Sequence, residues 1–425
     1  MFEHEKTISL GNHELRVPAL FASYRLGDYP TSGLRKFPWA MTRTEALLIN
    51  AYDFTRRKYQ HQLASGWNAA KHLNFQGKPI IIDSGAYYFM KKSNISITPS
   101  EVLDIELRSN ADVGVALDHP FPPDAKDKAK RIATTIRNTE IMAREISSSS
   151  HTMSLMPVIH GHTPAHIHKC INQLRSIADR YHTPLLDHVG IGSLAPLAQC
   201  GDAKLAVDVI HTVRQALPRS QIHCFSMGSA LLMHLAFYSG ADSVDSQTWM
   251  VSAGFKLAQL PGHYVMRMAK REYKGEEKFR QAMAQFRQRL AILADQEGFT
   301  AKDWLSGHSI DLTQSAARKR YVENLIDLKS NEHVHNRACH NLWSFNFEVR
   351  QYRKAKYDGL LDEFLQSRLA DTRYGNAFQH AKKLHAKARC ALAQPLLPVA
   401  CPVAARALTS SVSGYMTKVR GIRRP

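Results

Sequence analysis

Eight short segments of the chain are almost entirely apolar, and most are separated by stretches with a helical pattern. They occupy residues 17–22, 46–51, 79–83, 113–118, 155–160, 188–192, 222–226 and 243–245. Runs that are apolar at nearly every position, rather than at alternate ones, are typical of strands buried on both faces, as in a parallel sheet. These segments therefore predict eight parallel strands.

The spacers carry apolar residues at intervals of three and four, as an amphipathic helix requires. Two spacers show this pattern clearly, one through Ile132, Ile136, Ile141 and Met142, the other through Ala203, Ala206, Val209, Ile210, Val213 and Leu217. Eight strands with helical crossovers in roughly 250 residues predict an α/β fold of the (β/α)8 TIM-barrel type. An open, doubly wound sheet is the alternative.

The remainder of the chain reads differently. A stripe at 4-3-4-3 spacing predicts one more amphipathic helix, docked on the barrel, through Phe279, Met283, Phe286, Leu290 and Leu293. We divide the chain into a catalytic barrel domain, 1–304, a small, mostly helical C-terminal subdomain, 305–385, and a basic tail, 386–425. The tail has no acidic residue, is rich in Ala and Pro, and is expected to be poorly ordered.

Charge points to the kind of partner. The chain has 56 Lys and Arg against 37 Asp and Glu, a net charge of +19, which favours a polyanion, with nucleic acid ahead of an anionic membrane surface. The basic face beside the apolar stripe is a candidate contact for the nucleic-acid backbone, through Lys270, Arg271, Lys274 and Lys278. A plain solvated face is the alternative for these four residues.

The six cysteines are scattered, without a C-x-x-C pair, which is typical of free thiols in a reducing compartment. The first residues lack the layout of a signal peptide, and no apolar run is long enough to span a bilayer. We therefore expect a soluble, cytoplasmic protein without a membrane partner.

Polar residues close strand after strand. The predicted strand ends read Asp83, Asp118, His160, Gly192-Ser193, Ser226 and Asp245. In a barrel of this type the chemistry lies at the C-terminal ends of the strands, so these residues predict a single site. Two acids delivered there are what glycosyl transfer needs, since one can act as nucleophile and the other as acid and base.

Several motifs, in order along the chain, carry a family resemblance. The sequences Asp83-Ser-Gly-Ala-Tyr-Tyr88, Ile191-Gly-Ser-Leu194 and Gly240-Ala-Asp-Ser-Val-Asp245-Ser246 resemble the D-S-G-G-F-Q, I-G-G-L and G-V-D-M-F-D-C motifs of the tRNA-guanine transglycosylase superfamily. Members of that superfamily are (β/α)8 barrels that exchange a guanine for a 7-deazaguanine. The resemblance runs from about residue 79 to 254 and returns at 339–342.

The resemblance implies roles for the two acids. Asp245 would be the nucleophile that attacks the sugar C1′, with Asp242 as a rival for that role. Asp83 would be the general acid and base, although an Asx turn before Gly85 would also account for it.

A base-binding set follows from the same resemblance. Asp118 would accept from the N1–H and amine edge of guanine, while His160 and the backbone N–H groups of Gly192 and Ser193 would donate to O6. The purine would lie between Tyr87 and Phe225. Ordinary core packing is the alternative for His160 and Phe225.

The departures from the family pattern concern the polymer. The family follows its nucleophile with Pro-Thr-Arg, where this chain has Gln247-Thr-Trp249, and its C-x-C-x-x-C zinc motif is missing. Only His340 remains of that zinc set, and a zinc ion would have to take further ligands from among His308, Asp311, His335 and Cys339; surface or helix-capping histidines are the alternative. This altered set resembles the branch that inserts 7-deazaguanines into DNA, the DpdA-type transglycosylases.

Together these features predict a DNA-guanine transglycosylase that inserts a preQ0-like base through a covalent Asp-glycosyl intermediate, with no cofactor required for the chemistry. The target guanine would be flipped out or single-stranded. Accessory modification proteins and a second copy of the chain are candidate partners. The alternatives are the same exchange on tRNA and a non-catalytic nucleic-acid-binding barrel.

Overall fold

The computed structural model describes residues 6–27, 34, 36–92, 94–199, 201–296, 299–326 and 331–393. The chain divides into two compact units, Met1–Leu384 and His385–Pro425. The described part of the second unit, residues 385–393, is the end of one helix, so helical structure continues past residue 386. The rest of the predicted tail, 394–425, lies outside the described residues.

A parallel sheet forms the centre of the first unit. Its strand order in the described residues is β7-β6-β5-β4-β3-β11-β10-β9-β8, and every pairing in it is parallel. The strands are β3 (Ala19–Tyr24), β4 (Ala46–Asn50), β5 (Ile80–Asp83), β6 (Val113–Val115), β7 (Ser154–Met156), β8 (Val158–Ile159), β9 (His188–Ile191), β10 (Gln221–Cys224) and β11 (Ser243–Ser246). Each predicted apolar segment overlaps one of them, except that 155–160 overlaps two.

The sheet closes through that divided segment. β7 pairs with β6 and β8 pairs with β9, while the two strands are separated only by Pro157. Proline has no N–H to donate to a ladder, so the pairing is interrupted at this residue. The nine strands therefore form a ring of eight segments, and the predicted TIM barrel is confirmed.

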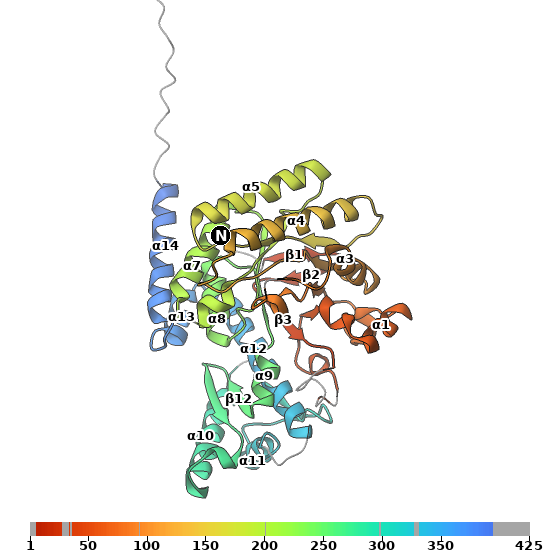
Figure 1. The fold of residues 1–425 in the computed structure, drawn as a ribbon. Coiled ribbons are helices and arrows are strands. Elements are labelled where there is room, and N and C mark those ends of the chain that lie inside the picture. Colours follow the sequence, from red (N-terminus) through yellow and green to blue (C-terminus); the bar gives the residue numbers. More distant parts are fainter. Residues whose placement is uncertain are drawn as a thin grey trace, which may run out of the picture. The chain divides into compact units, whose positions relative to one another are not determined.

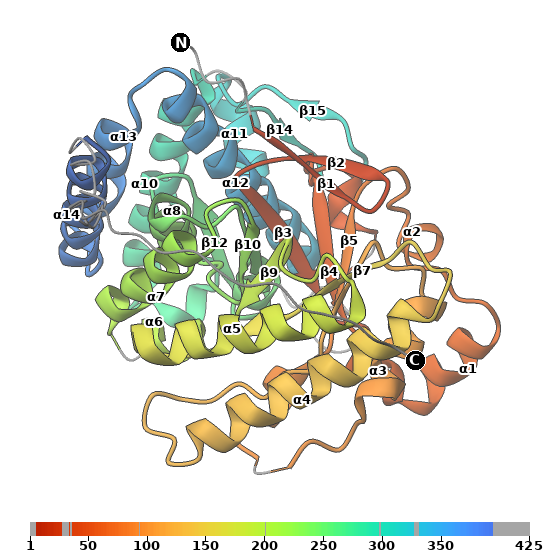
Figure 2. The same ribbon diagram turned by 90° about the horizontal axis from the view of Figure 1, so that it is seen from above.

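Helices surround the strands (Figure 2). Those of the barrel are α1 (Arg57–Ala64), α2 (Ala69–His72), α3 (Pro99–Arg108), α4 (Lys128–Ser147), α5 (Pro164–Tyr181), α6 (Leu194–Gln199), α7 (Ala203–Ala216), α8 (Ala230–Ser239) and α9 (Thr248–Gly254). Alternate strand residues bury against these helices or fill the barrel interior. The hairpin of β1 (Thr7–Leu10) and β2 (His13–Arg16) adds Ile8, Leu10 and Leu15 to the interior cluster.

A second hydrophobic core follows α9 (Figure 1). It is built on β12 (Leu257–Leu260), β13 (Tyr264–Arg267), α10 (Glu276–Ala294), β14 (Ala301–Lys302), β15 (Ser309–Ile310), α11 (Ser315–Glu323) and α12 (Asn331–Tyr357). The predicted stripe on α10 is buried here, beside Trp304 and Trp343, and not on the barrel as expected. The second core begins at Ala258, well before the predicted boundary at residue 304.

The last helices return to the barrel core. One face of α12 contributes Leu342, Phe345 and Val349 to the main cluster, and α13 (Leu361–Leu369) and α14 (Gly375–Ala393) contribute to it as well. The predicted subdomain 305–385 is therefore shared between two cores. Within the described part of the chain, no helix has the length and apolar character needed to cross a membrane.

Candidate active site

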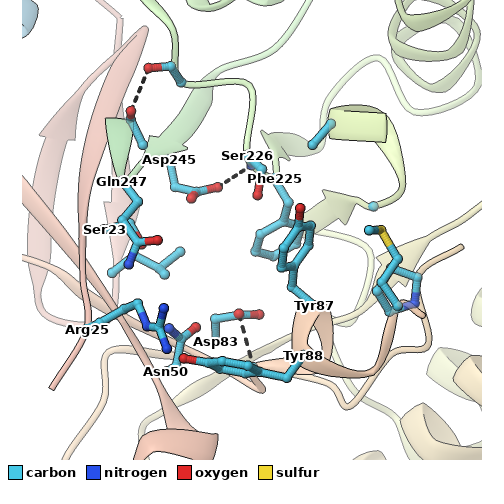
Figure 3. Close-up of a pocket in the computed structure, with 18 of the residues that line it drawn as sticks. Ser23, Arg25, Asn50, Asp83, Tyr87, Tyr88, Phe225, Ser226, Asp245 and Gln247 are labelled. Atoms are coloured by element: carbon cyan, nitrogen blue, oxygen red, sulfur yellow. Dashed lines mark hydrogen bonds between the residues drawn. The ribbon is translucent and has the colours of Figure 1, made fainter. Parts of the chain in front are cut away.

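A pocket of about 560 Å³ opens at the C-terminal ends of the strands. Its lining includes Asp83 at the end of β5, Asp118 just past β6 and Asp245 on β11. Asp83 and Asp245 approach the same central space from opposite sides (Figure 3). The barrel thus brings together three acids that lie far apart in the sequence.

Asp245 is held from one side. Its Oδ1 accepts a hydrogen bond from the backbone N–H of Ser226 at 2.6 Å, and Nε2 of His223 lies 3.5 Å from the same oxygen. Its rival Asp242 does not line this pocket. The carboxylate of Asp242 accepts instead from Lys6 at 2.7 Å and from Arg214 at 2.5 Å, which makes it a structural ion pair.

Asp83 is placed to carry a proton. Burial, together with the nearby charges of Asp118 and Asp245, raises its pKa well above the ordinary aspartate value. Its Oδ2 also accepts from the N–H of Gly85 at 3.2 Å, so the Asx turn and the position in the pocket occur together. Gly85 has φ of +80°, and a Cβ there would lie 2.6 Å from Cβ of Tyr52, so only glycine fits this turn.

Asp118 is fixed by a relay through His160. Nε2 of His160 lies 3.0 Å from Oδ2 of Asp118, and its Nδ1 lies 3.0 Å from Oγ of Ser193. The Ser193 hydroxyl oxygen accepts from the N–H of Phe121 at 3.0 Å. An arrangement with Nε2–H donating to the carboxylate and Ser193 donating to Nδ1 satisfies every partner.

His160 therefore differs from its predicted place. Its side chain is fully buried, it is not among the residues that line the pocket, and both ring nitrogens face protein partners. The sequence placed it in contact with the base, whereas the structure places it behind Asp118. A Cβ on Gly192 would lie 2.3 Å from Cε1 of this ring, so glycine is required for the ring to fit.

The remaining predicted base contacts do line the pocket. Gly192, Ser193, Tyr87 and Phe225 are all found there. Tyr87 is 52% exposed, whereas Phe225 is partly buried against the barrel interior. Ser193 and Ser226 have φ of +62° and +59°, values that are unfavourable for residues other than glycine, so two strand ends carry backbone strain at the site.

Sequence reasoning missed other residues of the pocket. Arg25, Asn50 and Tyr88 line it, and Figure 3 shows them beside Asp83. A signal was present for two of them. Positions 19 and 21 on β3 and 46 and 48 on β4 face the barrel interior. Arg25, one residue past β3, and Asn50, the last residue of β4, continue the same alternation.

The candidate zinc ligands have other partners. Nδ1 of His340 is 2.6 Å from the Tyr321 hydroxyl, and burial lowers the pKa of His340 to about 3. His335 lies within 3.1 Å of the carbonyl oxygen of Trp304 and 3.5 Å of Sγ of Cys339. His308 and Asp311 are exposed, and no three such side chains in the described ranges gather as metal ligands. These residues do not fit a zinc site.

The predicted backbone contacts lie apart from the pocket lining. Lys270, Arg271, Lys274 and Lys278 are all exposed, at or just before the start of α10. Lys270 pairs with Glu276. Their role in binding nucleic acid stays a prediction.

Comparison with known proteins gives consistent matches. The family model described as queuine tRNA-ribosyltransferase matches residues 6–374. Proteins named tRNA-guanine(15) transglycosylase from Archaeoglobus fulgidus and Methanosarcina mazei are each 26% identical, over 210 and 224 residues. These matches cover 49% and 52% of this chain and 42% of each relative. A protein of the same name from Methanobrevibacter smithii is 28% identical over 214 residues, 31% of its own length. The matches thus span less than half of these relatives.

Proposed function

The chain belongs to the queuine tRNA-ribosyltransferase family, and from that premise we propose that it is a guanine transglycosylase. It exchanges a guanine in a nucleic acid for a 7-deazaguanine base such as preQ0. The observation that carries the proposal is the pair Asp83 and Asp245, which face one pocket at the C-terminal ends of β5 and β11. A module that only binds nucleic acid has no need of two acids so arranged.

The reaction proceeds in two displacements. Asp245 attacks C1′ of the sugar, the bond from C1′ to the guanine nitrogen breaks, and the proton on Asp83 passes to the departing base. The incoming 7-deazaguanine then attacks C1′, gives its ring proton to Asp83 and releases Asp245. Two inversions restore the configuration at C1′, and the proton balance of the whole exchange is zero. The residues of the pocket carry these steps without a cofactor.

Asp118 reads the guanine edge in this scheme. Its Oδ2 is engaged by His160, while Oδ1 has a weak partner in the Ser84 hydroxyl at 3.4 Å. A carboxylate so oriented accepts from the N1–H and amine groups, and Tyr87 and Phe225 border the face of the ring. His160 acts through Asp118 as a positioning residue.

Two polymers are candidates. The names of the relatives, which are 26–28% identical over about half of this chain, support tRNA. The segment after the nucleophile supports DNA, because Gln247-Thr-Trp249 replaces the family's Pro-Thr-Arg and Trp249 is fully buried. In either polymer the guanine has to leave the stack to reach the acids of the pocket.

Incorporation of labelled preQ0 into unmodified tRNA, single-stranded DNA and duplex DNA tests the proposal. Wild type is compared with Asp245→Asn and Asp83→Asn, and with the exposed Asp104→Asn on α3 as a matched control. We expect label in one polymer class, loss of label in both pocket variants, and wild-type incorporation by the control. Label that survives Asp245→Asn would remove the proposed nucleophile, and label in none of the polymers would leave a binding barrel.

A further inference from the structure

A positive side chain lies among the acids of the pocket. Among the described residues that line it, three are acids and the one cation is Arg25. A neutral base has no anionic group for this guanidinium to bind, whereas the backbone of a polynucleotide has one at every linkage. Arg25 is therefore placed to contact an anionic part of the substrate.

Arg25 belongs to an inward-facing row across three neighbouring strands. Tyr24 pairs with Ile49, so the next positions, Arg25 and Asn50, lie level with each other. Asn50 in turn pairs with Asp83. The row thus consists of Arg25, Asn50 and Asp83, and Figure 3 shows these three side chains together on one side of the pocket.

The guanidinium of Arg25 packs on Tyr88, which is itself held by a hydrogen bond to Asp53. It stacks over the Tyr88 ring, 5.0 Å from the centroid, and the Tyr88 hydroxyl donates to Oδ1 of Asp53 at 3.3 Å. Asp53 is fully buried and also accepts from the N–H of Leu26 at 2.9 Å. A stacked, planar guanidinium is well suited to bidentate contact with a phosphate.

A second guanidinium lies close to this support of Tyr88 and Asp53. Asp53 interacts electrostatically with the guanidinium groups of Arg56 and Arg25, and Arg56 lies 3.6 Å from its Oδ1.

The order of the strands fixes which anion reaches this point. β3 lies between β11, which carries Asp245, and β4, which is followed by β5 with Asp83. A sugar whose C1′ lies between Asp245 and Asp83 therefore passes beside β3. The anionic groups attached to that sugar in a polynucleotide are its phosphodiesters.

We propose that Arg25 binds a phosphodiester of the polynucleotide strand next to the guanine that is exchanged. This inference rests on the proposed function and deepens it, because it places the backbone of the target nucleotide over β3. It also fits the segment after the nucleophile, where Gln247-Thr-Trp249 supplies no cation to the strand. Arg25 is then a residue that distinguishes the polymer from a free nucleoside.

The kinetic test compares Arg25→Gln and Arg25→Lys with wild type, and uses Arg175→Gln, an exposed change on α5, as the charge-matched control. For Arg25→Gln we expect the KM for the polynucleotide to rise about 10-fold and the slope of log KM against log salt to fall by about one. The KM for the 7-deazaguanine base should not change. For Arg25→Lys we expect a smaller rise in the KM for the polynucleotide, since lysine keeps the charge but lacks the planar, stacked guanidinium.

A chemical double-mutant cycle locates the contact. Single-stranded DNA and RNA oligonucleotides with one guanine carry a neutral methylphosphonate at one linkage at a time, and their binding to wild type and Arg25→Gln is measured by fluorescence anisotropy. For one linkage beside the guanine, wild type should lose about 10-fold in affinity and Arg25→Gln should lose nothing further. The polymer that shows this coupling identifies the source of the phosphodiester.

Two results would overturn the inference. One is an equal loss in both proteins at every linkage, and the other is an Arg25→Gln variant that changes the KM for the base and leaves that for the polynucleotide unaltered. Failure of the proposed function is a separate result, since it appears as absence of base exchange by wild type. The binding cycle does not depend on that exchange.

Discussion

At the scale of single residues, three carboxyl groups share one pocket and their surroundings separate their tasks. Desolvation and the charges of two other acids raise the pKa of Asp83 and so favour its protonated form. Asp118 is tied to His160, and Asp245 to the N–H of Ser226. Neighbours that differ in this way are how one pocket holds both an acid and a nucleophile at the same pH.

The raised pKa of Asp83 predicts a trade between stability and activity. The pKa of Asp83 is higher in the folded protein than in the unfolded chain. The free energy of unfolding therefore falls as pH rises from the unfolded pKa of Asp83 toward its folded pKa. Asp83→Asn removes this loss, so its free energy of unfolding at pH 8 should exceed that of wild type, with a smaller difference at pH 5. Urea unfolding at both pH values measures this.

The same variant should lose base exchange by at least about 100-fold, because it has no proton to give. In wild type the rate of exchange should decline as pH rises through the pKa of Asp83. A variant less stable than wild type at pH 8, or a rate that stays flat with rising pH, would contradict the assigned state of Asp83. Asp104→Asn is the control for a general charge effect.

His160 predicts a change in base binding without direct contact with the base. His160→Phe removes the partners of Asp118 and Ser193 and should cost about 2 kcal/mol of stability. The KM for the 7-deazaguanine should rise at least about 10-fold, and that for the polynucleotide should rise as well, because Asp118 contacts both the departing guanine and the incoming base. His160→Gln, which can donate and accept, should restore part of the base affinity.

Steady-state kinetics with each substrate varied in turn separates the two KM values. A purely structural role for His160 would lower the stability of His160→Phe and leave the KM for the base at its wild-type value. That outcome would exclude positioning of Asp118.

At the scale of elements, helix α12 joins the two hydrophobic cores. One face contributes Cys339, Trp343 and Phe347 to the second core, and another face contributes Leu342, Phe345 and Val349 to the barrel. Glu348 lies at this junction, fully enclosed. It accepts from His234 of α8 at 2.7 Å, from Arg368 of α13 at 3.2 Å and from the N–H of Gly262 at 2.7 Å.

Glu348 therefore predicts a pH-dependent part of the stability. Although burial opposes its ionisation, the hydrogen bond from His234 and the charge of Arg368 lower its pKa to about 2. A lowered pKa stabilises the fold above the unfolded value of about 4.5 by about 3 kcal/mol, and this is lost as pH falls toward 2. Glu348→Gln should lose a similar amount at pH 7, by urea unfolding.

The exposed Glu363→Gln on α13 serves as the control for that experiment and should change stability little. The difference between wild type and Glu348→Gln should shrink as pH falls below about 4.5. If the difference were constant from pH 7 to pH 3, the charge of Glu348 would not be the source of the stability.

At the scale of the whole molecule, apolar and aromatic packing supports the second core where the family has a zinc motif. His340, Tyr321 and Trp304 form a connected group, with the Tyr321 hydroxyl 2.6 Å from His340 and 3.2 Å from Nε1 of Trp304. Burial also raises the pKa of the neighbouring Cys339 thiol well above its usual value, which disfavours the thiolate that zinc binds.

Removal of metal should therefore leave the fold unchanged. Dialysis of the protein against a zinc chelator is expected to leave Tm the same, since the described residues around His340 pair with one another. Differential scanning calorimetry before and after dialysis measures this. A fall in Tm of about 5 °C that added zinc restores would show a structural metal.

The barrel was predictable because its signals are local. Each strand corresponds to a short apolar run, and most strand ends carry a polar residue. The number of strands and the pair Asp83 and Asp245 could therefore be predicted from the sequence. The second core was harder to place. The stripe through Phe286 shows which face is buried, yet a periodic pattern does not say which other element covers that face.

The sequence by itself determined the fold class, the family and the acids at the strand ends, since all three depend on residue type and short spacing. Tertiary structure alone decided the partners. In the folded protein His160 contacts Asp118 and not the pocket. Asp242 pairs with Lys6 and Arg214, and Arg25 lines the pocket. These outcomes depend on strand register and on contacts between distant segments, and no local pattern of side chains specifies either one.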